Sequence, residues 1–229
     1  MRVGIAGYGV VGKTRHRSIE SNTSYQITAI SESNEEARKF IPADIKIYND
    51  YKSLIASADI DVIFISLPNQ FASEAACLSL QRGLHVFCEK PPARTHAELL
   101  EVEKQSLKFP ELKLMYGFNH RFHLSVEEAK LLIDSNSLGR LINMKGVYGK
   151  SQMISFNQTD WRTNREASGG GILLDQGIHM LDLMRYLSGE NFTEVFSIID
   201  NAFWNFDVED NAYVLMKSPK GLVSQLHSS

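Results

Sequence analysis

The sequence predicts an α/β protein: a doubly wound parallel sheet, followed by a smaller α+β domain with an open, mainly antiparallel sheet. Short apolar runs alternate with helical patterns over residues 1–118, and such alternation is typical of a parallel sheet with helices on both faces. A glycine-rich turn at residues 7–12 joins the first apolar run to the first helical pattern. In residues 119–229 strand-like runs gather after helices, which favours an antiparallel sheet.

In the first domain, the run at 61–67 (D-V-I-F-I-S-L) is apolar on both faces, as a central parallel strand requires. The expected strands are residues 2–6, 25–31, 45–48, 61–67, 85–88 and 112–118. The expected helices are residues 10–21, 34–40, 52–58, 71–82 and 96–108.

In the second domain, a long apolar helix is expected to open at the three glycines 169–171 and to run to about residue 187. The other expected elements are a helix at 125–133, a polar loop after 148, and strands at 141–148, 194–199, 212–217 and 222–226. The sequence stops inside or just beyond the last expected strand, which is an unusual place for a sheet domain to end.

The composition excludes several classes of protein. The chain has 229 residues, with 24 basic against 27 acidic side chains and a net charge of −3, so nucleic acid is not an expected partner. Cys77 and Cys88 are too few for a disulfide framework and lack metal-ligand spacing. Neither a signal peptide nor an apolar stretch of roughly 20 residues is present, which predicts a cytoplasmic protein that does not enter a membrane.

The turn at residues 7–12, G-Y-G-V-V-G, has the spacing of a dinucleotide-binding fingerprint. Gly7 permits a tight turn, Gly9 lets the backbone approach a pyrophosphate, and Gly12 allows close packing of helix on strand. Val10 and Val11 begin the helix, whose N-terminal N–H groups and partial positive charge suit a pyrophosphate. The turn therefore predicts a Rossmann dinucleotide-binding domain, residues 1–118.

Glu32 follows Gly12 by 20 residues, at the end of the second expected strand. A carboxylate there can accept hydrogen bonds from the adenosine ribose and repels a 2′-phosphate, which favours NAD as the cofactor. NADP stays open, because Lys13, Arg15 and Arg17 on the first helix could reach a phosphate, although charged residues on a helix are usually a solvated face. A plain structural turn with a solvated glutamate is the alternative.

The segment C-E-K-P-P, with Lys90 at its centre, follows the expected strand at 85–88. Ligands of open α/β sheets bind outside the carboxyl ends of the strands. The Lys90 ammonium could hydrogen-bond a substrate hydroxyl there and stabilise the alkoxide that forms as hydride leaves. A surface lysine before a proline-stiffened loop explains the segment equally well.

Asp175, His179 and Asp182 stand at i, i+4 and i+7, which places them on one helix face. A histidine can take a proton near neutral pH, and a neighbouring carboxylate can orient it. One alternative is a structural histidine capped by its own carboxylates. Another is a metal site, which we do not expect because no third ligand has a recognisable spacing.

Three further motifs occur along the chain. They are Leu67-Pro68-Asn69, the run G-F-N-H-R-F at 117–122, and Asp160-Trp161-Arg162. Together with the glycine turn, Glu89-Lys90-Pro91 and the Asp175–His179 pair, in this order and spacing, they make the whole chain resemble the Gfo/Idh/MocA family. Members of that family are NAD(P)-dependent oxidoreductases, most of which act on sugars, sugar derivatives or cyclitols.

The resemblance implies that Lys90 sits between nicotinamide and substrate and that His179 is the acid/base, with Asp175 beside it. It adds four residues to the cofactor site: Leu67, Pro68, Asn69 and Glu89. It also implies that an open sheet in domain 119–229 mediates a homodimer or homotetramer. The chain departs from the family in two ways. Ala72 stands where the family often has a histidine. Family members also usually run further at the C-terminus, which implies that domain 119–229 is truncated in mid-sheet.

The implied substrate is a small sugar-type molecule, and the expected substrate ligands are Asn119, Arg121, Tyr148, Trp161, Arg162, Asp175 and His179. Trp161 could stack on a pyranose, with Lys150 as another polar candidate, while Arg162 and Arg165 could hold a phosphate, a carboxylate or a nucleotide diphosphate. Alternatively Trp161 packs between the domains and the arginines pair with Glu166 or Asp160.

The predicted function is hydride transfer between NAD(P) and a secondary alcohol or ketone of a sugar, sugar nucleotide or cyclitol. One alternative is an NAD-binding sensor or partner protein without turnover. The other is an enzyme whose tightly held NAD is oxidised and reduced within one turnover, giving net epimerisation, elimination or hydrolysis.

Overall fold

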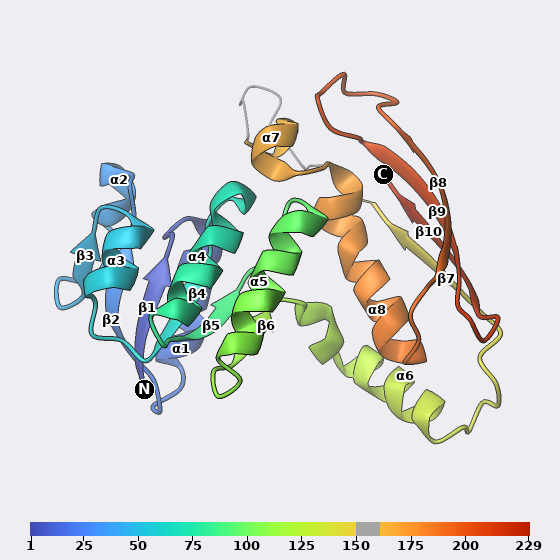
Figure 1. The fold of residues 1–229 in the computed structure, drawn as a ribbon, viewed down its shortest axis with the longest axis horizontal. Coiled ribbons are helices and arrows are strands. Elements are labelled where there is room, and N and C mark those ends of the chain that lie inside the picture. The colour runs from blue at the N-terminus through green and yellow to red at the C-terminus, as the bar shows by residue number, and fades with distance from the viewer. Residues whose placement is uncertain (150–160) are drawn as a thin grey trace. The chain divides into compact units, whose positions relative to one another are not determined.

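The computed structural model describes residues 1–149 and 161–229. They divide into two compact units, Met1–Gly117 and Phe118–Ser229, and each unit is described by itself (Figure 1). Within the described ranges, every helix falls short of the length and apolarity that a membrane crossing requires.

The first unit is built on a six-stranded sheet in the order β3-β2-β1-β4-β5-β6, in which every pairing is parallel. Its strands are β1 (Arg2–Ala6), β2 (Gln26–Ser31), β3 (Lys46–Tyr48), β4 (Val62–Ile65), β5 (His85–Cys88) and β6 (Leu114–Tyr116). Its helices are α1 (Val10–Glu20), α2 (Glu35–Arg38), α3 (Tyr51–Ser57), α4 (Asn69–Gln81) and α5 (His96–Lys108). The predicted doubly wound fold is confirmed.

Both faces of this sheet are buried, which explains the apolar strands. Ile5 and Val62 belong to one core cluster, whereas their chain neighbours Ala6 and Ile63 belong to another. Side chains of a strand alternate between faces, so the two clusters lie on opposite faces. The strand order reverses between β1 and β4, and the crevice at such a reversal is where open α/β sheets bind ligands.

The second unit has a four-stranded sheet in the order β7-β10-β9-β8. Its strands are β7 (Asn143–Tyr148), β8 (Glu194–Asp200), β9 (Asn211–Lys217) and β10 (Val223–Ser228). The β8–β9 and β9–β10 pairs are antiparallel, as expected, but β10 pairs in parallel with β7. The sheet is therefore mixed.

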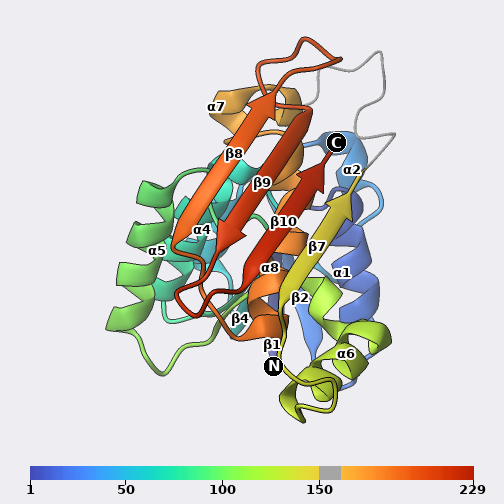
Figure 2. The same ribbon diagram turned by 90° about the vertical axis from the view of Figure 1, so that its right-hand side faces the viewer.

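One face of this sheet is covered by α8 (Ile178–Ser188), which lies behind the strands in Figure 2. Met184 of α8 is 2% exposed and shares a core cluster with Leu226 of β10. Gly146 of β7 allows this approach, because a Cβ there would lie 2.8 Å from the Met180 methyl carbon. The unit also contains α6 (Leu124–Asp134), α7 (Arg165–Ser168) and the short helices η1 (Asn119–Phe122), η2 (Trp161–Thr163) and η3 (Leu173–Gly177).

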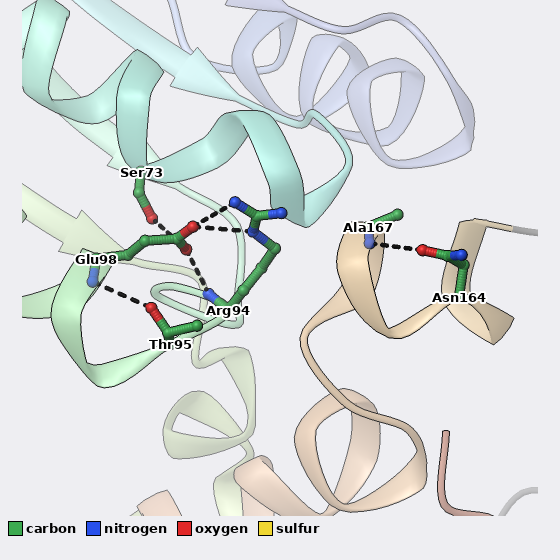
Figure 3. Close-up of polar contacts among 6 residues, drawn as sticks. All are labelled: Ser73, Arg94, Thr95, Glu98, Asn164 and Ala167. Atoms are coloured by element: carbon green, nitrogen blue, oxygen red, sulfur yellow. Dashed lines mark hydrogen bonds and ion pairs between the residues drawn. The ribbon is translucent and has the colours of Figure 1, made fainter. Parts of the chain in front are cut away.

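The prediction of one long helix from residue 169 is wrong at the start of that helix. Gly169, with φ 86°, ends the four-residue helix α7, which was expected to be loop. Asn164 begins α7 by accepting a hydrogen bond from the Ala167 N–H at 2.9 Å, as Figure 3 shows. The chain then makes a π-helical turn, η3, before α8 begins. Gly177 of η3 packs against β10, where a Cβ would lie 2.5 Å from Ser228 Oγ.

Candidate active site

The glycine turn leaves an open cradle beside the backbone between β1 and α1. Gly7 has φ 88°, and a Cβ on this residue would lie 2.5 Å from the Ser66 carbonyl oxygen. A Cβ on Gly12 would lie 2.1 Å from the Gly7 oxygen. Gly9 differs, because among the described residues other than its own chain neighbours no atom lies within 4 Å of its Cβ position. Gly7 and Gly12 thus shape the turn, whereas Gly9 leaves room for a ligand to touch the backbone.

The N-terminus of α1 fits an anion. No side chain of the described residues caps it, and its first turn, residues 10–13, carries no acidic residue. Val10 is 85% exposed and Val11 is 41% exposed, so the first turn is accessible. Free N–H groups and the helix dipole favour a phosphate at such a terminus. The cradle and the helix end together fit the pyrophosphate of a dinucleotide.

Glu32 directly follows β2 and holds the glycine turn in place. Its carboxylate accepts hydrogen bonds from the N–H of Tyr8 and from the N–H of Asn34, both at 2.8 Å. Arg38 of α2 lies beside it, donating from Nε to the Glu32 carbonyl at 2.6 Å and from Nη2 to the Ser33 carbonyl at 3.3 Å. Arg38 was not predicted, because only Lys13, Arg15 and Arg17 of the first helix were considered as basic residues near the cofactor.

The basic residues of α1 do not act as one phosphate site in this structure. Lys13 Nζ lies 4.4 Å from the Phe40 ring centroid. Arg17 Nη2 donates to Thr14 Oγ1 of the same helix at 3.2 Å. Arg15 is committed to a carboxylate, since its Nε donates to Glu89 Oε1 at 2.6 Å.

Lys90 is placed where ligands of such sheets bind. It is half-buried, two residues after the end of β5, which pairs with β4. Leu67, Pro68 and Asn69 follow β4, and Asn69 is the first residue of α4. Because all strands are parallel, these residues and the glycine turn lie at the same, carboxyl edge of the sheet. Ala72, the departure from the family pattern, is 4% exposed and packs in the core.

In the second unit, aromatic rings surround His179. This residue of α8 is 5% exposed, and its ring is stacked on that of His120 with centroids 4.0 Å apart and planes at 21°. Tyr148 of β7 lies 6.1 Å away and contacts His120, with its Oη 3.5 Å from His120 Nε2. The ring of Phe118 meets His179 edge-on. Sequence reasoning named His179 and Tyr148, but not the stacked His120.

The three polar residues of the predicted helix face have different surroundings. Asp175 is half-buried in the π-helical turn and accepts a hydrogen bond from Gln176 Nε2 at 2.8 Å. Asp182 forms a two-pronged ion pair with Arg121, with Nε donating to Oδ2 at 2.7 Å. This pair raises the pKa of Arg121 above its ordinary value, chiefly through the hydrogen bond to Asp182. Of the two aspartates, Asp175 is therefore the candidate to act with His179.

The remaining predicted substrate residues lie on the short helices of this unit. Asn119 is exposed at the start of η1. In η2 the Arg162 guanidinium lies 4.4 Å from the Trp161 ring centroid. Arg165 of α7 donates from its N–H and its Nε to Asp207, at 3.0 and 3.1 Å. Lys150 and Asp160 lie outside the described residues.

No group of three or more metal-ligating side chains occurs within the ranges that the structure describes. The candidate residues form two sets. The first unit holds an anion cradle with Glu32 and Lys90, and the second unit holds His179 with its aromatic partners. The first set, on a doubly wound parallel sheet, is typical of the class of proteins that bind a dinucleotide on a Rossmann domain.

Comparison with known families identifies the chain within this class. The family described as "Oxidoreductase family, NAD-binding Rossmann fold" matches residues 1–116, and the "GFO/IDH/MocA C-terminal domain" matches residues 126–229. The chain belongs to the Gfo/Idh/MocA family, as the sequence motifs predicted.

Individual relatives are sugar dehydrogenases. Levoglucosan dehydrogenase of Pseudarthrobacter phenanthrenivorans is 30% identical over 83% of this chain and 52% of its own length. D-glucoside 3-dehydrogenase of Escherichia coli is 30% identical over 89% of this chain and 58% of its own. A solved levoglucosan dehydrogenase, in complex with NADH and levoglucosan, has a TM-score of 0.92 and 26% identity over 100% of this chain and 66% of its own. The chain thus spans little more than half the length of these curated relatives.

Proposed function

We propose that this protein is an NAD-dependent dehydrogenase that oxidises a secondary alcohol of a sugar or cyclitol, and that reduces the ketone in reverse. The observation that carries the proposal is the open cradle at Gly9, beside an uncapped helix N-terminus and next to Glu32. The dehydrogenases of levoglucosan and D-glucosides to which the chain is similar support a pyranose or a similar polyol ring as substrate.

The residues of the cradle would hold the cofactor. Backbone N–H groups of residues 9–12 would bind the pyrophosphate, Glu32 the adenosine ribose, and Leu67, Pro68, Asn69, Glu89 and Lys90 the remainder of the site. Bound NAD supplies the hydride acceptor, at C4 of its nicotinamide ring.

His179 and Lys90 have separate roles in this proposal. His179 takes the proton of the substrate hydroxyl at its imidazole, with Asp175, one turn earlier, orienting the ring. The ring of His120 is stacked on His179 and limits the orientations that the imidazole can take. Lys90 donates a hydrogen bond from Nζ to a substrate hydroxyl oxygen and stabilises the negative charge that develops as hydride leaves.

For substrate binding we propose Asn119, Arg121, Tyr148, Trp161 and Arg162. The indole of Trp161 offers an apolar face on which the C–H groups of a pyranose can stack. The Arg121 guanidinium donates a hydrogen bond to Asp182. This bond holds the guanidinium in place, so Arg121 would contribute a fixed hydrogen-bond donor.

The reaction is tested by incubating the purified chain with NAD⁺ and a panel of pyranoses, cyclitols and sugar nucleotides while absorbance at 340 nm is recorded. Net formation of NADH by one group of substrates supports a dehydrogenase. Cofactor that copurifies and shows no net reduction would point to the recycling enzyme, and binding without any response to substrate would point to the sensor.

Glu32→Ala should weaken NAD⁺ binding about ten-fold or more and narrow the preference for NAD⁺ over NADP⁺. The substitution removes a charged acceptor, and hydrogen bonds to charged groups contribute about 1.5–3 kcal/mol. It also removes the acceptor for Tyr8 N–H, which holds the glycine turn. Calorimetric titration with both cofactors measures the effect.

The matched control is Glu35→Ala, which removes an exposed glutamate from the first turn of α2. It should leave both affinities unchanged. A Glu32→Ala variant that keeps the wild-type preference would show that Arg38 or other residues determine the choice of cofactor.

We further propose that the protein works in the cytoplasm as a homodimer or homotetramer formed through the second sheet. The face of this sheet opposite α8 exposes Phe196 (65%), Ile198 (60%), Tyr213 (44%) and Leu215 (49%). The strand register places Phe196 opposite Leu215, and Ile198 opposite Tyr213. An apolar patch of this kind typically marks an interaction surface.

Phe196→Asp should therefore convert an oligomeric wild type to a monomer, as measured by light scattering after size exclusion. Leu107→Asp, at a 75% exposed leucine of α5, should leave the oligomeric state unchanged. A monomeric wild type would contradict this part of the proposal.

A further inference from the structure

The segment that carries Lys90 is held at both of its ends by contacts within the first unit. Residues 89–95, here called the Lys90 loop, connect β5 to α5. At the start of the loop, Glu89 N–H donates to the Ile65 carbonyl at 2.9 Å, which continues the pairing of β5 with β4. Both ends also carry an arginine–glutamate pair, and the two pairs differ in what they connect.

The pair at the far end is local. Glu98 in the first turn of α5 accepts hydrogen bonds from the Arg94 N–H and from Arg94 Nε, both at 2.9 Å. Thr95 Oγ1 caps the Glu98 N–H at 3.2 Å, and Ser73 of α4 also donates to the carboxylate (Figure 3). This network fixes the end of the loop on α5.

The pair at the near end connects the loop to another element. Arg15 belongs to α1, and its Nε and Nη2 both reach Glu89 Oε1, at 2.6 and 2.5 Å. The two side chains are only 24% and 17% exposed. The Coulombic attraction within a charge pair this well shielded from water is stronger than that within a pair at the surface.

The Arg15–Glu89 pair also packs against Gly117 and Phe87. A Cβ on Gly117 would lie 2.7 Å from Glu89 Oε2, so only glycine leaves room for the carboxylate at this position. On the other side, the Arg15 guanidinium lies 4.9 Å from the Phe87 ring centroid. The pair is therefore held by packing as well as by charge, and Lys90 is the next residue along the chain.

We propose that Arg15 is a positioning residue: through Glu89 it couples the phosphate-binding end of α1 to the Lys90 loop. Arg15 lies in the second turn of the helix whose first turn forms the anion cradle, and a helix transmits position over such a distance as a rigid body. An anion that orders the start of α1 thereby also orders the loop that presents Lys90. The inference rests on the proposed function, which gives Lys90 its role in the reaction.

The test is hydrogen exchange with and without ADP, which carries the adenosine and pyrophosphate groups but no nicotinamide. In the wild-type chain ADP should slow exchange both in the glycine turn and in the Lys90 loop. In Arg15→Met, ADP should slow exchange in the glycine turn alone, and the loop should exchange about ten-fold faster or more, the scale expected for the loss of one charged hydrogen bond. Arg15→Lys keeps the charge but not the two-pronged contact, so it should be intermediate.

Kinetics provide a second readout. Arg15→Met should lower kcat roughly 10- to 100-fold, because a small misplacement of a catalytic group has effects of that order, while the KM for NAD⁺ stays within about two-fold.

Arg2→Met is the matched control, since Arg2 pairs with Asp61 at the amino end of β1, the opposite edge of the same sheet. It should leave the response of the loop to ADP and kcat unchanged. A loop that responds to ADP equally in wild type and Arg15→Met would overturn the inference. A wild-type chain that binds neither ADP nor NAD⁺ would overturn the proposed function, and the inference with it.

Discussion

Replacing His179 with alanine should lower kcat by about 10²–10⁴-fold, the range that a positioned general base contributes. His179 is 5% exposed and stacked on His120, so its imidazole is held in one place before substrate binds. The affinity for NAD⁺ should remain close to that of the wild type, because the cradle at residues 7–12 and Glu32 belong to the other unit. Steady-state kinetics and calorimetry on one preparation measure both quantities.

His96→Ala is the control, because His96 is exposed at the start of α5. It should leave kcat and NAD⁺ affinity unchanged. If His179→Ala retained the kcat of the wild type, another residue would be the proton acceptor, and the ring cluster of His120, Tyr148 and His179 would be structural.

Replacing Lys90 with alanine should lower kcat by about 10²–10³-fold, the effect seen when one donor to a developing oxyanion is lost. The half-buried position of Lys90, at the carboxyl edge of the parallel sheet, makes this donor part of a preformed site. NAD⁺ affinity should change little, since the pyrophosphate and adenosine contacts stay intact.

The control for this substitution is Lys104→Ala, at a lysine of α5 whose side chain is 67% exposed. Its kinetics should equal those of the wild type. Equal activity of Lys90→Ala and Lys104→Ala would remove Lys90 from the mechanism and would leave the Lys90 loop with a structural role.

The sequence was sufficient for features that depend on neighbouring residues. The parallel sheet followed from the alternation of short apolar strands with helices, because burial on both faces requires strands such as β4 to be apolar throughout. The glycine turn followed from the spacing of three glycines between β1 and α1, two elements that are neighbours in the chain. Family membership followed from the order of several such local motifs.

Features that depend on distant partners were not predicted. Arg15 and Glu89 are 74 residues apart, and Arg121 and Asp182 are 61 apart. No helical or strand period relates residues at such separations. The parallel pairing of β10 with β7 is equally non-local, and the hydrophobic pattern of a strand does not specify the direction of its neighbour.

The π-helical turn η3 was missed for a different reason. Apolar residues surround Asp175 and continue into α8, so the sequence has the pattern of one regular helix. The turn is widened where Gly177 lies against Ser228 of β10. Such turns occur often at functional sites, and this one ends two residues before His179.

The central claim is that the first unit binds NAD through the glycine cradle and Glu32. The most direct test is calorimetric titration of the 229-residue chain with NAD⁺ and with NADP⁺, on a sample whose folding is verified by circular dichroism. We predict saturable binding of one NAD⁺ per chain, with NADP⁺ bound more weakly. A folded chain that binds neither cofactor would contradict the account, and a preference for NADP⁺ would contradict the role assigned to Glu32.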